Sequence, residues 1–130
     1  MHYASPKHER LYRNVARGRG YKPHTLAALF LLTAHRKLWR KWCKAIDNKG
    51  LDWTAGNGLD PGWDGDALQA AALSIQKSQA PQVTLHQLAD PIEYPQELLR
   101  LVITALWIAR NDPKATREIM IKKEGRLAIC

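Results

Sequence analysis

The sequence predicts an all-α fold, a compact bundle of about four to five helices with one long loop rich in Asp, Gly and Trp. Apolar residues recur at helical spacing in several segments, and Ser, Pro, Asn and Gly stand where those segments begin and end. Of the 130 residues, 45% are hydrophobic and 25% are charged, which are ordinary values for one globular domain. We therefore expect residues 1–130 to form a single helical domain.

The first two expected helices each begin at a proline. Ser5 can cap a helix from Pro6 to Ala16, because serine binds free backbone N–H groups and proline fits the first turn. A glycine-rich turn at residues 18–20 ends this helix. Pro23 opens a longer helix that reaches about Ile46 and stops at the turn-forming run 47–50.

A loop and two short helical segments are expected next. Residues 51–65 are rich in Gly and Asp and contain two tryptophans, a composition that favours a packed loop. Asp64 or Asp66 can cap a third helix that runs through Ile75. Thr84 can cap a single turn over Leu85 to Ala89.

The last strong helical segment begins at Pro95 and stops at Asn111. It is apolar almost all round, so we expect this helix to be central to the core and Trp107 to be buried. The tail from Lys114 to Lys123 alternates apolar and charged residues and predicts a last helix or a docked strand.

The chain is strongly basic. Lys and Arg number 20 against 12 Asp and Glu, which gives a formal net charge of +8 and a pI of about 9.8. This excess favours an acidic partner such as nucleic acid, an anionic membrane or an acidic protein surface. In a helical projection, cations of the second helix fall on one side, away from Trp39 and Trp42. They are Arg36, Lys37, Arg40, Lys41 and Lys44.

Further cations lie in the first helix and the turn after it. If the first two helices pack as an antiparallel hairpin, some of these cations join the same surface. Arg10 and Lys22 lie in this segment, and the residues that we assign to the surface are Arg13, Arg17 and Arg19. The name "predicted basic face" is used below for these three arginines together with the five cations of the second helix.

Two other interpretations of the predicted basic face remain open. Lys and Arg can simply keep a helix surface soluble, and the sequence fits this about as well. The segment from Arg36 to Trp42 also has the composition of a helix that lies in a membrane interface.

No motif for catalysis or cofactor binding is found. The carboxylates between Asp52 and Asp66 lack the spacing of an EF-hand, and the five histidines lack HxxxH or HExxH spacing. Cys43 with His35 or His86 shows no signature of a cysteine hydrolase. We therefore expect no catalytic residue, no metal and no cofactor.

The sequence favours a cytoplasmic protein with reduced thiols. Cys43 lies inside an expected helix and Cys130 is the last residue, which is a poor pattern for a disulfide. No signal peptide or membrane span is found.

Several segments carry a resemblance to a known group of proteins. They are His8 with Tyr12, the run from Ala28 to Ala34 followed by Leu38 and Trp39, and Leu98 to Leu101 with Leu106 and Trp107. In these segments the chain resembles an uncharacterised family of small helical proteins from Gram-positive bacteria and their phages. The resemblance implies an all-helical fold and a phage or mobile-element setting, and it assigns no activity or site residue.

The expectation is a non-enzymatic binding module in a bacterial host cell, whose basic helical face engages nucleic acid or the nucleic-acid-binding surface of a nucleoprotein complex. The phage-like setting makes an anti-CRISPR-type counter-defence inhibitor a concrete version. One alternative is a small metal-dependent hydrolase or nuclease that uses the loop carboxylates Asp52, Asp60, Asp64 and Asp66. Another is a structural or assembly protein.

Overall fold

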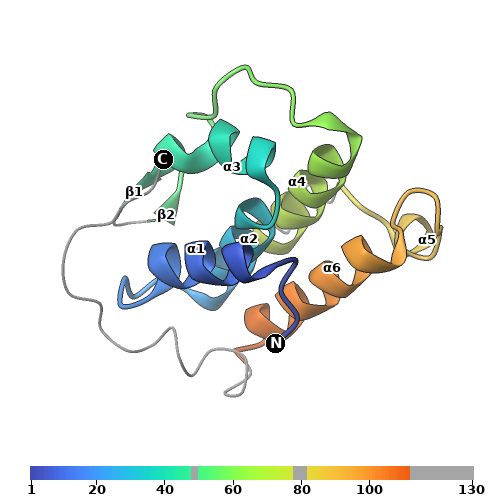
Figure 1. The fold of residues 1–130 in the computed structure, drawn as a ribbon, viewed down its shortest axis with the longest axis horizontal. Helices are drawn as coiled ribbons and strands as arrows, with labels where there is room; N and C mark the ends of the chain where they lie inside the picture. The colour runs from blue at the N-terminus through green and yellow to red at the C-terminus, as the bar shows by residue number, and fades with distance from the viewer. Residues whose placement is uncertain (48–49, 78–81, 112–130) are drawn as a thin grey trace.

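The computed structural model describes residues 1–47, 50–77 and 82–111 (Figure 1). The α-helices in these ranges are α1 (Pro6–Ala16), α2 (Pro23–Thr33), α3 (Arg36–Trp42), α4 (Gly62–Gln76), α5 (Leu85–Leu88) and α6 (Gln96–Ala109). A 3-10 helix, η1 (Cys43–Ala45), follows α3, and β1 (Ile46–Asp47) pairs antiparallel with β2 (Gly50–Leu51). The mostly helical character predicted from the sequence is confirmed. The expected tail element at Lys114 to Lys123 lies outside the described residues.

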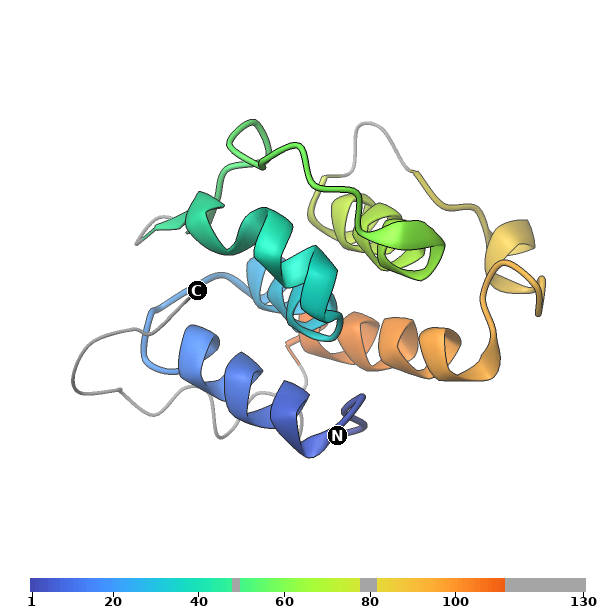
Figure 2. The ribbon, with the colours of Figure 1, turned by 45° about the horizontal axis from the view of Figure 1, so that its top comes forward.

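Helix α2 is the centre of the fold. It packs against α1, α3, α4 and α6, which surround it on several sides (Figures 1 and 2). Every residue from Thr25 to Thr33 is buried, because a helix that is apolar all round must be covered on all sides. The expected bundle of four to five helices is therefore corrected to a set of helices packed around one central helix, with a small two-stranded sheet beside them.

Helix α6 lies at the surface, and the expectation that it is central was wrong. Leu101, Ala105 and Ile108 face the core, whereas Leu106 is 44% exposed and Trp107 is 50% exposed. Apolar residues on both sides of a helix do not tell which side will meet a partner. Among the described residues, neighbours cover one side of α6, and the half-exposed Trp107 corrects the prediction that this residue is buried.

Local signals placed several helix ends correctly. Ser5 Oγ accepts a hydrogen bond from His8 N at 3.1 Å and caps α1, as expected. Thr84 and Gln87 form a reciprocal capping box around α5. Helix α4 is a correction, because it starts at Gly62, and Asp64 lies in its first turn rather than at its cap.

The long helix predicted from Pro23 to Ile46 is interrupted at Ala34 and His35. His35 has an extended backbone, with φ −131° and ψ 125°, and its Nδ1 accepts a hydrogen bond from Leu38 N at 3.2 Å. This side chain therefore caps a separate helix, α3. The break redirects the chain, so that α3 lies across from α1 with α2 behind them (Figure 2).

No helix within the described ranges is long and apolar enough to cross a membrane. Trp39 and Trp42 are both buried, so the segment that resembles an interfacial membrane helix does not present its aromatic residues to the outside.

Candidate binding groove

Helices α1 and α3 lie across from each other (Figure 2), and residues of both line a groove of about 1180 Å³. Its lining contains five cationic side chains and, among the described residues, no Asp or Glu. The five are Lys7 and Arg10 from α1, Arg36 and Arg40 from α3, and Lys44 from η1. We call this feature the basic groove.

The wall formed by α3 and η1 carries three cations that recur every fourth residue. Arg36, Arg40 and Lys44 are exposed, and the four residues of α-helix from Arg36 to Arg40 rise about 6 Å. Trp39 and Trp42 are buried between them and the core. The buried tryptophans fix the rotation of the helix, and this rotation turns the row of cations towards α1.

In the α1 wall, too, buried residues determine which side of the helix is exposed. Tyr12, Val15 and Ala16 are buried against the core, and this leaves Lys7 and Arg10 on the exposed side of the helix. The two cations are three residues apart, so they project from the same side. Positive charge therefore lines the basic groove from both helices.

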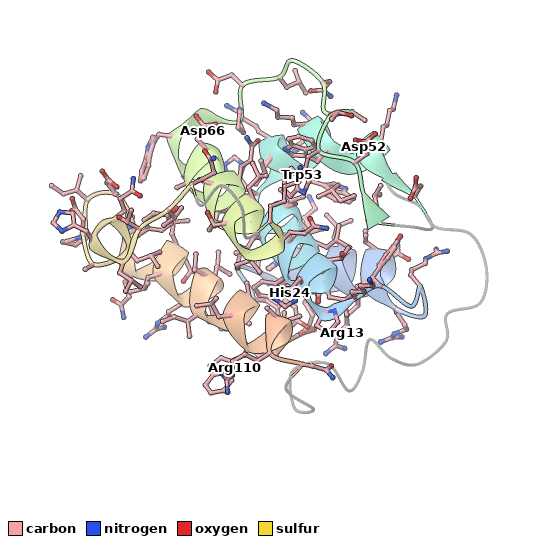
Figure 3. The ribbon with its side chains drawn as sticks, turned by 180° about the vertical axis from the view of Figure 1, so that it is seen from behind. Arg13, His24, Asp52, Trp53, Asp66 and Arg110 are labelled. Carbon is pink, nitrogen blue, oxygen red and sulfur yellow. The ribbon has the colours of Figure 1, made fainter. Side chains whose placement is uncertain are left out.

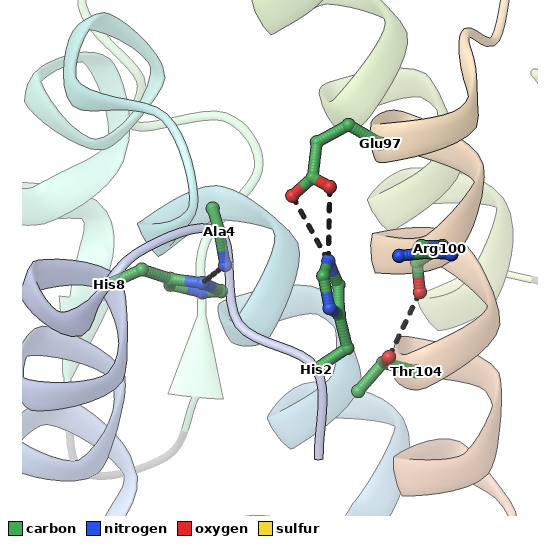
Figure 4. A network of polar contacts seen from close by, with 6 residues as sticks. All are labelled: His2, Ala4, His8, Glu97, Arg100 and Thr104. Atoms are coloured by element: carbon green, nitrogen blue, oxygen red, sulfur yellow. Dashed lines mark hydrogen bonds and ion pairs between the residues drawn. The ribbon is translucent and has the colours of Figure 1, made fainter.

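His8 is a buried structural residue at the edge of the basic groove. Its Nδ1 accepts a hydrogen bond from Ala4 N at 3.0 Å (Figure 4). Its Nε2 donates to Phe30 O at 2.8 Å. Burial lowers the pKa of His8 from 6.5 to about 4, because a charged imidazole loses its hydration there. His8 is therefore neutral at neutral pH, with both ring nitrogens in use.

The segment before α1 is also attached to α6. His2 Nε2 lies 3.1 Å from both carboxylate oxygens of Glu97 (Figure 4). Together with the capping bond of Ser5, this contact holds the start of α1, and so the position of the α1 wall, from both sides.

The Asp/Gly/Trp loop supplies a third wall. Asn57 Nδ2 donates to Arg40 O at 3.0 Å, and Asn57 N donates to Lys41 O at 3.2 Å. These bonds attach the loop to the end of α3, and Leu59 then lines the basic groove. The two tryptophans expected in this loop differ, because Trp53 is half-buried and Trp63 is exposed.

Two indole rings attach this loop to the helices: Trp42 belongs to α3, and Trp53 belongs to the loop itself. The ring centroids of Trp42 and Trp53 are 4.9 Å apart at an interplanar angle of 70°, a favourable edge-to-face arrangement. Trp42 Nε1 donates to Gln69 Oε1 at 2.9 Å, and Trp53 Nε1 donates to Gln76 Oε1 at 2.8 Å. Both indoles are thereby fixed against α4.

The loop carboxylates take part in turns. Asp52 accepts hydrogen bonds from Thr54 N and Thr54 Oγ1 at 2.9 and 2.6 Å, and these bonds lower the pKa of Asp52. Asp60 accepts from Gly62 N at 2.9 Å, and Asp64 Oδ1 lies 3.3 Å from His35 Nε2.

These carboxylates do not gather at one point. Asp52 lies near the start of the loop and Asp66 lies within α4, well separated from it (Figure 3). Within the described part of the chain, no three side chains of His, Cys, Asp or Glu come together in a way that could hold a metal ion. The arrangement that the metal-dependent alternative requires is not assembled by these residues.

Three of the five cations that the second expected helix contributes to the predicted basic face line the basic groove: Arg36, Arg40 and Lys44. Lys37 and Lys41 are not among the lining residues, and Lys41 Nζ lies 5.9 Å from the ring centroid of Trp42. The basic groove therefore takes up only part of the predicted set.

The three arginines assigned from the first helix and turn also lie apart from the basic groove. Arg13 forms an ion pair with Glu9 at 3.7 Å, and its guanidinium carbon lies 6.0 Å from the ring centroid of Tyr3. Arg17 and Arg19 are half-buried and are not among the lining residues.

Two lining cations were not assigned to the site from the sequence. Arg10 was noted only as part of the basic segment, and Lys7 was missed. A signal was present, because Lys7, Arg10 and Asn14 follow helical spacing on the side opposite the buried Tyr12. It could not be used without knowing that α1 faces α3.

Cys43 is buried and disulfide-bonded, which corrects the expectation of a reduced thiol. Cys130, the other cysteine of the chain, lies outside the described residues. Disulfides are rare in a reducing cytosol, so the bond gives no support to the expected cytoplasmic location.

Comparisons with known protein families, with curated proteins and with solved structures gave no significant match. The resemblance to small helical phage proteins therefore stays a prediction.

Proposed function

We propose that the protein is a non-enzymatic module that binds nucleic acid through the basic groove. The observation that supports this is the composition of the lining, with five cations from two helices and no carboxylate among the described residues. Cations placed within a Debye length of one another, about 10 Å at 0.1 M salt, act together on a polyanion. Each phosphate that they neutralise releases counterions and strengthens binding.

A surface designed only for solubility would have a different arrangement. Soluble surfaces intersperse both signs of charge, whereas like charges four residues apart on a helix destabilise it slightly. The row Arg36, Arg40 and Lys44 carries this cost in the free protein. A bound polyanion offsets the repulsion, and this favours a binding role over simple solvation.

The lining residues also favour binding over catalysis. A nucleophile needs a nearby base to activate it. Both ring nitrogens of His8 are already used in hydrogen bonds, and Cys43 is disulfide-bonded. Ser5 Oγ accepts the capping bond from His8 N, so these residues serve the fold.

The proposal is tested by fluorescence anisotropy with labelled oligonucleotides across a salt series. Replacing Arg40 and Lys44 with Gln should weaken binding and lower the slope of log affinity against log salt by roughly 0.7–0.9 per lost phosphate contact. The matched control replaces Lys22 and Lys37 with Gln. Both lysines are exposed and lie outside the lining. This control also removes two charges, and it should leave the slope almost unchanged.

Two results would contradict the proposal. Equal losses in both double variants would mean that only net charge matters. Absence of oligonucleotide binding at low salt would exclude nucleic acid as the ligand. If the protein then competed with nucleic acid for an acidic protein surface, the proposal of nucleic-acid binding would be replaced by that of a counter-defence inhibitor of the anti-CRISPR type.

A further inference from the structure

We infer that the ligand of the basic groove is single-stranded nucleic acid in an extended form, and not a duplex. This inference rests on the proposed function and adds the class of nucleic acid. Three properties of the basic groove support it: the apolar part of its lining, its shape and the spacing of its cations.

Much of the lining of the basic groove is apolar. Leu11, Ala34 and Leu59 line it together with the cations, and the exposed lining is mostly apolar. A duplex keeps its bases stacked inside and turns phosphates and sugars outward, so it offers little to such a lining. A single strand exposes both phosphates and base faces. Only the single strand matches both parts of the lining.

The shape of the site favours the same ligand. Proteins that read duplex DNA usually insert a protruding helix or strand pair into the major groove, which is about 12 Å wide. Here the cations line a recess between α1 and α3, and the loop at Leu59 adds a further wall. The cations are thus presented inside a recess and not on a protruding element, and one strand can lie along this recess.

The spacing of the cations on this side of the groove fits one backbone. Arg36 and Arg40 lie four residues apart on α3, about 6 Å along its axis, and Lys44 follows in η1. The step from Arg36 to Arg40 is comparable with the distance between successive phosphates of an extended strand. In a duplex each strand winds away from a straight row. The bases of a strand placed along these cations can turn towards Leu59 on the loop wall.

The decisive comparison uses one 12-nucleotide sequence as a labelled single strand and as a duplex, each titrated with the protein at the same salt concentration. We expect the single strand to bind at least tenfold more tightly. If the duplex binds equally well or better, the inference is wrong while the proposed function stands. If neither form binds at low salt, the proposed function itself fails.

A pair of leucine variants tests the role of the apolar lining. Leu59 is 48% exposed and lines the basic groove, whereas Leu85 is 85% exposed and lies outside the lining. Leu59→Ser should weaken single-strand binding several-fold without changing the salt slope, because it removes an apolar contact and no charge. Leu85→Ser should change neither. Unchanged single-strand affinity in Leu59→Ser would overturn the inferred base contact.

Discussion

Gly56 lies against the indole of Trp42 so closely that a Cβ atom on Gly56 would come within 2.6 Å of Cζ3 and 2.7 Å of Cη2. The ring cannot easily move away, because Trp42 Nε1 is bonded to Gln69 and Trp53 packs on the indole. The close approach explains how the loop lies flat on α3 and forms a wall of the basic groove.

Gly56→Ala is therefore expected to destabilise the protein by about 1–3 kcal/mol, the usual cost of overpacking. Gly58 belongs to the same loop, and a Cβ atom there meets nothing within 4 Å. Gly58→Ala should leave the free energy of unfolding almost unchanged. Urea denaturation of both variants measures the difference, and equal midpoints would contradict the close packing on Trp42.

Helix α6 allows a comparison between its two sides. Leu101 is 2% exposed, so Leu101→Ala should cost about 2–5 kcal/mol. Trp107 is 50% exposed, and the guanidinium of Arg110 lies 5.9 Å from its ring centroid. Trp107→Ala should cost only about 1 kcal/mol, because much of the ring is already in water. Thermal or chemical denaturation in which Trp107→Ala costs as much as Leu101→Ala would mean that this ring is buried after all.

The buried His8 makes stability depend on pH in a defined window. Its pKa is about 4 in the folded protein and 6.5 when unperturbed, so between these values the unfolded state binds more protons. The contribution of neutral His8 to the free energy of unfolding is fully present above pH 6.5. It is lost as the pH falls towards 4, by about 3 kcal/mol in all.

Urea denaturation at pH 7.0, 5.5 and 4.5 measures this loss. In His8→Gln the difference between these pH values should shrink, even if the overall stability is lower. His86 is exposed, so His86→Gln should keep the full dependence. A wild-type midpoint that stays constant across the window would show that His8 is not buried in the neutral form.

The crowded cations of the basic groove predict an unusual response to salt. Screening weakens repulsion among like charges, so raising NaCl from about 10 mM to about 150 mM, where the Debye length is about 8 Å, should raise the denaturation midpoint of the free protein. The Arg40 and Lys44 double variant should respond less than the Lys22 and Lys37 control, since only the former removes charges from the groove. Identical responses would show that the groove cations do not repel one another appreciably.

The sequence predicts those helix ends whose signals are local. Ser5 with Pro6, and Thr84 with Gln87, place the polar group and the helix start within three residues of each other. Such short-range chemistry acts largely independently of the rest of the fold.

The break at His35 could not be predicted in this way. Histidine is not among the preferred capping residues, and here its ring is also held by Asp64, 29 positions along the chain, at 3.3 Å. A contact between segments so far apart depends on the fold as a whole. The direction of α3 depends on this break. The sequence therefore also could not predict that α3 faces α1 across the basic groove.

The relative burial of α2 and α6 was also undetermined. Both segments are apolar over most of their surface, and burial follows from how many neighbours surround each. The charge of the candidate site was easier to predict than its place, because net charge depends on composition alone. Which cations share one groove depends on the rotation and pairing of two helices.

From Thr25 to Thr33, helix α2 has no face towards the solvent, since each of these residues is buried under α1, α3, α4 or α6. Its amide hydrogens can therefore exchange with deuterated water only when a covering helix detaches, and such an opening costs nearly as much free energy as complete unfolding. Two of those covering helices, α1 and α3, are the walls of the basic groove. A ligand that holds these two helices together thus slows amide exchange along a helix that it never touches.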